Sequence, residues 1–311
     1  MRRVASLGAG NSDAMISAPG VVAHMIVGRR TEPYLADALS SIADVCAHAV
    51  INDNSGDAGG PNDSTIGACA FARSGRLTHL RTVFIDFSAA RNACIEATPE
   101  AFRGGWALFA DADEVHGEEL RAMVRVLPRL PSDVDALDGY SRNFIGSFDY
   151  WNTMHRRLRF FRLAPGRRWE GGVHERLVPL GRREALPAVG AHYGHVCTPE
   201  MEVERERLYK SLGQPVTLLD KAASLETLTP ALVWGEQLRD ALAFHGQHPA
   251  AAVATIARLR VEWADTFAAV DQIVAAQSVF DRARNAIRAA NYGQVLVFRV
   301  AEARLRWGFR E

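Results

Sequence analysis

Three carboxylates follow an apolar run in the first half of the chain, and they are the residues whose spacing points most directly to chemistry. The run Trp106–Phe109 is typical of a buried strand, and Asp111, Asp113 and Glu114 come directly after it. Side chains two residues apart on a strand share a face, so Asp111 and Asp113 can converge on one point beyond its end. Carboxylate oxygens suit Mg²⁺ or Mn²⁺, which commonly carry phosphate-bearing substrates. Such a segment is more often a solvated turn or a helix start, so the neighbouring motifs must decide whether it is a metal site.

The composition is that of an ordinary soluble globular protein. The chain has 311 residues, of which 48% are apolar and 23% are charged, enough for a catalytic domain and a smaller second one. Basic and acidic residues both number 36, which gives no electrostatic case for a nucleic-acid partner. No stretch approaches 18 apolar residues, so we expect no transmembrane segment.

The cysteine spacing indicates the cellular compartment of the protein, and the composition of the N-terminal residues indicates how they fold. Cys46, Cys69, Cys94 and Cys197 are widely spaced and form no CxxC pair, so we interpret them as free thiols in a reducing compartment and expect a cytoplasmic protein. Residues 1–20 are rich in Gly, Ala and Ser, which predicts a flexible leader.

Apolar runs and amphipathic segments alternate over the first third of the chain. The predicted order is strand Val21–Val27, helix Tyr34–Cys46, strand Ala47–Ile51, strand Arg81–Ile85, helix Ala89–Ala97 and strand Trp106–Ala110. This order predicts an α/β fold with a mostly parallel sheet flanked by helices, which binds ligands at the carboxyl ends of its strands. Residues 137–180 favour antiparallel strands and loops, and the chain turns strongly helical after Pro199.

Polar clusters fall where the other predicted strands end. Asp53, within Asn52–Asp57, is well placed to accept hydrogen bonds from a nucleobase imide or ribose hydroxyls, although the cluster is also compatible with a plain Asx-rich turn. Ser88 and Arg91 open a helix whose N–H groups and guanidinium would favour a phosphate. The alternative is that Ser88 is an N-cap and Arg91 lies on a solvated face.

These pieces together resemble the inverting glycosyltransferases of family 2, which have the GT-A fold. The resemblance rests on the order and spacing of four segments between residues 21 and 115, with two further segments extending it to about residue 196. They are Val27–Leu35, Val50–Asp57, Ala89–Asn92 and Asp111–Glu114, followed by Trp169–Glu175 and His192–Gly194. One departure is that Arg30 and Thr31 stand before Glu32, where the family usually has Asn.

The resemblance implies a GT-A catalytic domain over residues 21–198 and a helical C-terminal domain over 199–311, which could bind the acceptor or form a homodimer. The reaction implied is metal-dependent, inverting transfer of a hexose or N-acetylhexosamine from a nucleotide-diphosphate sugar, with a UDP-sugar favoured. The acceptor, a saccharide, peptide, lipid or natural product, would provide a hydroxyl or thiol.

Residue roles also follow from the resemblance. Asp53 would bind the donor base, Glu32 would lie in the turn near it, and Arg91 would contact the base or diphosphate. Asp111 would contact ribose or metal, and Asp113 would ligate the Mn²⁺ or Mg²⁺ that bridges the diphosphate.

Three residues after the predicted sheet complete the candidate site. For the base that deprotonates the acceptor we favour Glu175, next to His174, while an ion pair between Glu175 and a local arginine is an equal alternative. His192 could supply a nitrogen ligand to the metal or could be structural.

Two other functions remain compatible with the sequence. A sugar-phosphate nucleotidyltransferase would need a glycine-rich basic loop after the first strand, and Gly28–Arg30 is a poor match. A non-catalytic nucleotide-sugar-binding scaffold would not need Glu175 or the Asp111/Asp113 pair.

Overall fold

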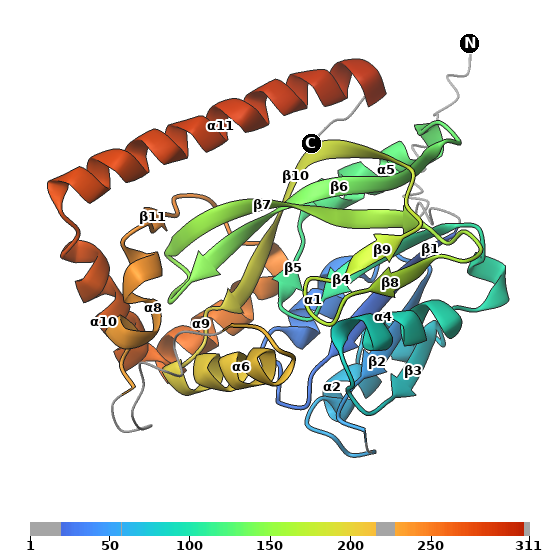
Figure 1. The fold of residues 1–311 in the computed structure, drawn as a ribbon, viewed down its shortest axis with the longest axis horizontal. Helices are drawn as coiled ribbons and strands as arrows, with labels where there is room; N and C mark the ends of the chain where they lie inside the picture. Colours follow the sequence, from blue (N-terminus) through green and yellow to red (C-terminus); the bar gives the residue numbers. More distant parts are fainter. Residues whose placement is uncertain (1–19, 57, 216–227, 308–311) are drawn as a thin grey trace, which may run out of the picture.

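The structure is a computed structural model that describes residues 20–56, 58–215 and 228–307 (Figure 1). The predicted leader therefore lies outside the described residues, except for Gly20. The strands are β1 (Val21–Val27), β2 (His48–Asp53), β3 (Leu77–Arg81), β4 (Trp106–Asp111), β5 (Glu114–Val115), β6 (Val134–Ile145), β7 (Tyr150–Arg162), β8 (Arg168–Glu170), β9 (Arg176–Val178), β10 (Arg182–His195) and β11 (Leu242–Ala243). The helices are α1 (Leu35–Ile42), α2 (Asp63–Gly67), α3 (Ala70–Arg73), α4 (Phe87–Glu96), α5 (Glu118–Val126), α6 (Pro199–Ser211), α8 (Pro230–Leu238), α9 (Val253–Glu262), α10 (Ala264–Ala275) and α11 (Val279–Trp307), with short 3₁₀ turns at Glu100–Phe102, Leu127–Arg129 and Ala250–Ala252.

The predicted α/β architecture is confirmed. The main sheet has the order β3-β2-β1-β4-β7-β6-β10-β5, in which β3, β2, β1 and β4 run parallel to one another and β7 runs antiparallel to β4. Helices flank this sheet and a helical region follows it (Figure 1). Nearly every residue of β1 is buried, as expected for a central strand covered on both faces.

One predicted strand is wrong in position. The third strand covers Leu77–Arg81 rather than Arg81–Ile85. Residues 82–86 lie beyond the end of β2 and pair with no strand in the described structure, so Val83 and Ile85 are left 66% and 71% exposed. The apolar run there was therefore not a sign of burial.

The order of the parallel strands creates a crevice at their carboxyl ends. The chain builds β2 and β3 on one side of β1 and then places β4 on the other. In this register Val27 pairs with Asp53 and Ile26 pairs with Asp111. Such a reversal of strand order opens the sheet edge to ligands.

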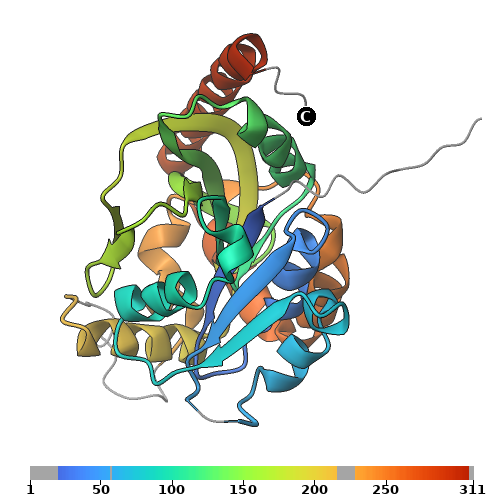
Figure 2. The same cartoon turned by 90° about the vertical axis from the view of Figure 1, so that its right-hand side faces the viewer.

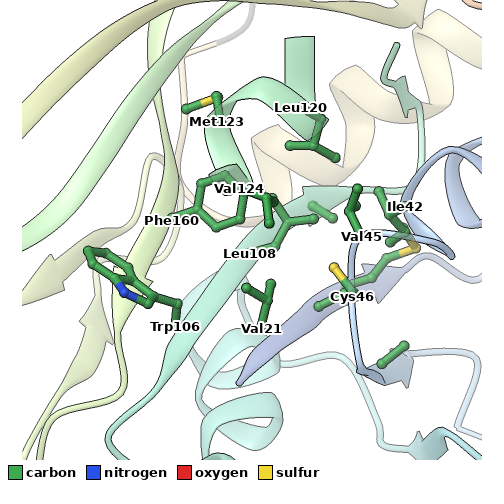
Figure 3. Close-up of a cluster of buried hydrophobic side chains, with 14 of the residues drawn as sticks. Val21, Ile42, Val45, Cys46, Trp106, Leu108, Leu120, Met123, Val124 and Phe160 are labelled. Atoms are coloured by element: carbon green, nitrogen blue, oxygen red, sulfur yellow. The ribbon is translucent and has the colours of Figure 1, made fainter. Parts of the chain in front are cut away.

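Alternate residues of β1 face two different cores. Val21 and Met25 pack with Leu108, Phe160 and the helices α1 and α5, as the close-up in Figure 3 shows for part of this cluster. Val22 packs on the opposite face with Phe109, Trp169 and a side chain from α4. The sheet is therefore a central layer whose two faces are both closed.

The helical region packs against the half of the sheet that contains β6 and β7. Trp234 of α8, which is 0% exposed, shares a core with Ile145 of β6, Cys197 and Val270 of α10. Within this region β11 pairs with β7, with Leu242 opposite Trp151. In the described residues, no helix is both long and apolar enough to cross a membrane.

We expect Trp234→Ala to lower the free energy of unfolding by about 3–5 kcal/mol, because it opens a cavity in a core that the helical region shares with β6. The measurement is urea unfolding followed by circular dichroism. Val261→Ala on α9, a side chain that is 78% exposed, is the control and should change stability by less than about 0.5 kcal/mol. Equal stability of the two variants would contradict the shared core.

Candidate functional site

A cavity of about 880 Å³ opens where β1 and β4 end. Its floor includes Ile26 and Asp111, which are paired in the sheet, and one wall is formed by α6. In Figure 2, α6 lies beside α4, and the rings of Phe87 and Tyr209 from these two helices are 6.1 Å apart. The cavity thus lies at the point where the strand order reverses, which is the expected ligand position in an open α/β sheet.

The turn between β4 and β5 brings Asp113 to His192. Nε2 of His192, on β10, lies 3.4 Å from Oδ1 of Asp113. Burial opposes the charged imidazolium, but the Asp113 carboxylate outweighs it and raises the pKa of His192. Burial also opposes charge on Asp113, and His192 nevertheless holds the pKa of this carboxyl well below its usual value.

Gly194 allows this close approach. A Cβ atom there would lie 2.5 Å from Oδ2 of Asp113 and 2.9 Å from Nε2 of His192. Real Cβ atoms do not come this close to other atoms, so a side chain at position 194 would displace the pair.

Asp111 is held by two guanidinium groups. Arg91 of α4 binds Oδ1, and Nη2 of Arg157 on β7 lies 2.6 Å from Oδ2. The Arg91 guanidinium carbon lies 3.8 Å from the centre of the Phe109 ring. Arg91 is therefore a buried site residue, and the alternative that it lies on a solvated face is wrong.

Glu114 is a buried ion-pair partner in β5, which makes it a structural carboxylate. Nη1 of Arg159 lies 2.5 Å from Oε2 and Nη2 lies 2.9 Å from Oε1, and Ser141 donates its hydroxyl to the same carboxylate. Glu114 and Arg159 are each 1% exposed. Burial opposes ionisation, yet Arg159 and Arg157 lower the pKa of Glu114 well below its usual value.

The loop between β8 and β9 carries His174 and Glu175 to the cavity. α4 holds this loop: Phe87 donates its N–H to the Gly172 carbonyl at 3.2 Å, and Ser88 donates to that of Gly171. His174 has a φ of 58°, in the left-handed region that costs most side chains energy. Strain at this position is consistent with a functional loop.

Glu175 is paired with Arg91. Nε of Arg91 lies 3.1 Å from Oε1 of Glu175, whose side chain is 11% exposed. The ion pair with a local arginine, raised above as an alternative for Glu175, is therefore present. It does not remove Glu175 from the cavity, which both residues line.

Glu32 also lines the cavity. Its Oε1 accepts a hydrogen bond from the Tyr34 N–H at 3.3 Å, while Asn62 accepts one from the Glu32 N–H at 3.0 Å. Burial, with a further contribution from the Asp113 charge, raises the pKa of Glu32 from 4.5 to about 7.

Asp53 is not among the residues that line the cavity. It is fully buried at the end of β2, where its Oδ1 accepts a hydrogen bond from the Ser55 N–H at 2.9 Å. Its Oδ2 lies 3.9 Å from Nε2 of His79, and Oδ1 of Asp63 lies 3.6 Å from the same nitrogen. Arg81 also binds the Asp63 carboxylate, to which its Nη2 donates a hydrogen bond at 2.8 Å.

Two arrangements of acidic and histidine side chains are therefore relevant to a divalent ion. Within the described residues, Asp53, Asp63 and His79 are a group whose ligand atoms lie within 4.8 Å of one another, but Arg81 already neutralises part of it. Asp113 and His192 line the cavity itself. His192 contacts the Asn143 amide oxygen through Nδ1, which leaves Nε2 directed at Asp113 and suits a metal-ligating imidazole.

The structure brings most of the predicted residues to one cavity, and Asp53 is the one that does not line it. The residues that do are Glu32, Arg91, Asp111, Asp113, His174, Glu175 and His192. Sequence reasoning missed Arg157 and Arg205, both of which line the cavity. Arg205 of α6 bonds Glu202 at 3.0 Å and His195 at 2.8 Å. The alternation of Arg157 and Arg159 on one strand was a usable signal for Arg157, because both contact Glu114 from the same face.

Comparisons with known proteins leave the family open. No protein-family model and no curated protein sequence matches the chain. Among solved structures it is similar to the mannosyltransferase PcManGT from Pyrobaculum calidifontis in complex with GDP-Man and Mn²⁺, with 16% identity, a TM-score of 0.43, and coverage of 94% of this chain and 88% of that one. It is also similar to residues 1–349 of S. aureus TarS, with 12% identity, a TM-score of 0.38, and coverage of 71% and 79%. Both TM-scores are below 0.5, so neither similarity supports a function.

We expect the stability of the protein to fall between about pH 5 and pH 8 through Glu32. Its pKa is raised on folding, so the folded state binds the extra proton and loses that advantage as the pH rises through about 7. Glu32→Gln should remove this loss, and its free energy of unfolding relative to the wild type should rise by about 1–3 kcal/mol over this range.

Urea unfolding at several pH values is the measurement. Glu204→Gln is the control, because Glu204 also lines the cavity but its side chain is 59% exposed. Parallel pH courses for Glu32→Gln and the wild type would contradict the prediction.

Proposed function

We propose that this protein is a GT-A glycosyltransferase that moves a hexose or N-acetylhexosamine from a nucleotide-diphosphate sugar, favouring a UDP-sugar, to an acceptor hydroxyl or thiol with inversion. The observation that carries the proposal is the mixed charge of the cavity at the strand-order reversal. Five carboxylates (Glu32, Asp111, Asp113, Glu175 and Glu204) and five guanidiniums (Arg29, Arg30, Arg91, Arg157 and Arg205) line one space. A ligand with an anionic diphosphate and sugar hydroxyls can use both signs.

The donor base is proposed to lie toward the ends of β2 and β3. Asn54 lines that end of the cavity with the apolar side chains of Phe84 and Ile85. An amide and apolar surface together suit a nucleobase, which needs both hydrogen bonds and contacts to its ring. Asp53 remains our prediction for a base contact, and it would have to reach past the Ser55 turn to make it.

The diphosphate is proposed to lie near α4 and α6, where Arg91 and Arg205 enter the cavity. The Arg91 guanidinium donates a hydrogen bond to the Asp111 carboxylate. Ribose hydroxyls bound by Asp111 would weaken this pair and free Arg91 for phosphate oxygens. These ion pairs thus keep the guanidiniums in position in the cavity.

Glu175 is proposed as the catalytic base and His174 as its neighbour in positioning the acceptor. The acceptor oxygen or sulfur attacks the anomeric carbon from the face opposite the leaving group, and its proton passes to the Glu175 carboxylate. The bond from the anomeric carbon to the diphosphate oxygen breaks, and its electron pair leaves with the nucleoside diphosphate. One in-line displacement inverts the anomeric centre.

Asp113 and His192, with Asp111 as a further oxygen donor, would hold a divalent ion. When bound, Mn²⁺ or Mg²⁺ would offset negative charge on the diphosphate as a Lewis acid. Residues of the chain would supply the remaining contacts to the diphosphate. Arg205 is one of them, because it contributes positive charge near Asp113.

We expect Glu175→Gln to lower kcat by about 10²–10⁴-fold, because the amide cannot accept the acceptor proton but can still bond Arg91. The measurement is release of nucleoside diphosphate in the presence of the accepted sugar donor and acceptor. Glu170→Gln on β8, an exposed carboxylate close in sequence, is the control and should retain full activity. Full activity of Glu175→Gln would exclude Glu175 as the base.

We also expect nucleoside diphosphates to raise the melting temperature more with Mn²⁺ than without it, because binding to the folded state adds about RT ln(1 + [L]/Kd) to stability. Asp113→Asn should abolish the Mn²⁺-dependent part of the shift. UDP, GDP and ADP, each with and without Mn²⁺, form the panel, and no acceptor is required. The proposal fails if no nucleoside diphosphate shifts the wild type, and pyrophosphate release from a nucleoside triphosphate and a sugar phosphate would favour nucleotidyl transfer instead.

A further inference from the structure

Helix α11 carries an apolar face that nothing in the described structure covers. The helix runs along one side of the molecule in Figure 1. Its outer side chains are unusually exposed for apolar residues: Phe280 is 75% exposed, Ile287 65%, Phe298 68% and Leu305 88%. A helix of 29 residues spans about 43 Å, so this face is long as well as apolar.

The opposite face of α11 fixes the helix to the rest of the protein. Asn285 is buried and donates to the Arg239 carbonyl at 2.9 Å, and Arg288 donates to the Asn152 carbonyl at 2.8 Å. The ring of Tyr292 lies 5.3 Å from that of Trp151, and Ala303 belongs to the main core. The exposed face is therefore held in a fixed orientation.

The spacing of the outer residues is that of a coiled-coil seam. Steps of four and three residues alternate along the whole helix at positions 280, 284, 287, 291, 294, 298, 301 and 305. Phe280, Ile287, Phe298 and Leu305 lie toward the two ends of this seam, and Asn291 and Gln294 lie at its centre. The two remaining positions hold Arg284, which is bonded to Asp240 of its own chain, and Ala301.

We propose that α11 pairs with α11 of a second copy of this chain in an antiparallel arrangement centred between Tyr292 and Gly293. In this register Phe280 meets the partner's Leu305, and Ile287 meets the partner's Phe298. Asn291 meets the partner's Gln294, which gives two amides that can bond each other and fix the register. The same patch serves both copies, as a two-fold interface requires.

The charges on the helix favour a second copy over a membrane surface. Most arginines on the seam or beside it are already paired with carboxylates of their own chain. Arg284 lies 2.6 Å from Asp240, Arg299 lies 2.8 Å from Glu302, and Arg306 lies 3.3 Å from Glu184. Few guanidiniums are left to attract anionic lipid, and the two central amides would be costly in an apolar lipid phase.

The first test measures the mass of the full chain in solution by analytical ultracentrifugation over a concentration series. We expect a dimer of twice the chain mass of 34.1 kDa. Phe298→Glu and Ile287→Glu should each raise the dissociation constant by at least about tenfold, since each change occurs twice in the interface. Val261→Glu, at a side chain that is 78% exposed on α9, is the matched control and should leave the dimer intact.

The second test reports the orientation of the two helices. Phe280→Cys combined with Leu305→Cys should form an intermolecular disulfide under mild oxidation, while either single variant should not. A wild type that is monomeric at all concentrations would overturn the proposal, as would a disulfide from Phe280→Cys alone, which indicates parallel helices. Sedimentation of the wild type, but not Phe298→Glu, with phosphatidylcholine–phosphatidylglycerol vesicles in place of dimerisation would also overturn it. None of these outcomes depends on transferase activity, so the proposed reaction is tested separately.

Discussion

The buried ion pair between Glu114 and Arg159 is the interaction on which the site depends. A charge taken out of water is costly unless it is paired and fully hydrogen-bonded, and Glu114 meets this condition with two guanidiniums and the Ser141 hydroxyl. The pair ties the two-residue strand β5 to the long strand β7. Because β5 follows directly after Asp113, the acidic turn is fixed in place from its far side. β5 also pairs with β10, where His192 lies opposite Glu114, so the ion pair and the strand pairing together fix this turn.

From this anchor the site is built as a chain of opposite charges. Arg157 joins Glu114 to Asp111, and Arg91 joins Asp111 to Glu175. Burial of Arg157 opposes its charge, but Glu114 and Asp111 raise its pKa. Asp111 and Glu175 are therefore each positioned by a cation that also binds another carboxylate. The cost is that every member of the series affects its neighbours, so substitutions within it will not act independently.

The sequence was a good guide to local structure and a poorer guide to what faces the cavity. The limits of β1 were predicted to the residue, and the acidic turn does follow β4, because a buried parallel strand is a continuous apolar run. Asp53 was expected in the same crevice by the same argument. Its strand ends beside His79 and Asp63, which come from the neighbouring strand and from α2, and no local pattern reveals that pairing. Arg205 was missed because its helix is charged all along its length, so nothing marked one arginine among several.

The position of Arg205 on α6 also bears on how this protein could be re-engineered. The predicted boundary at residue 198 falls between His195 and Arg205, which bond each other at 2.8 Å. Recombination at that boundary would replace Arg205 in the cavity that Asp113 also lines, and would change the electrostatic potential where the diphosphate is proposed to bind. A chimera made to alter acceptor choice would thus alter the donor half of the site as well. With a crossover after Ser211, α6 and the sheet would come from the same parent protein. Arg205 and Asp113 would then remain together as in the original protein.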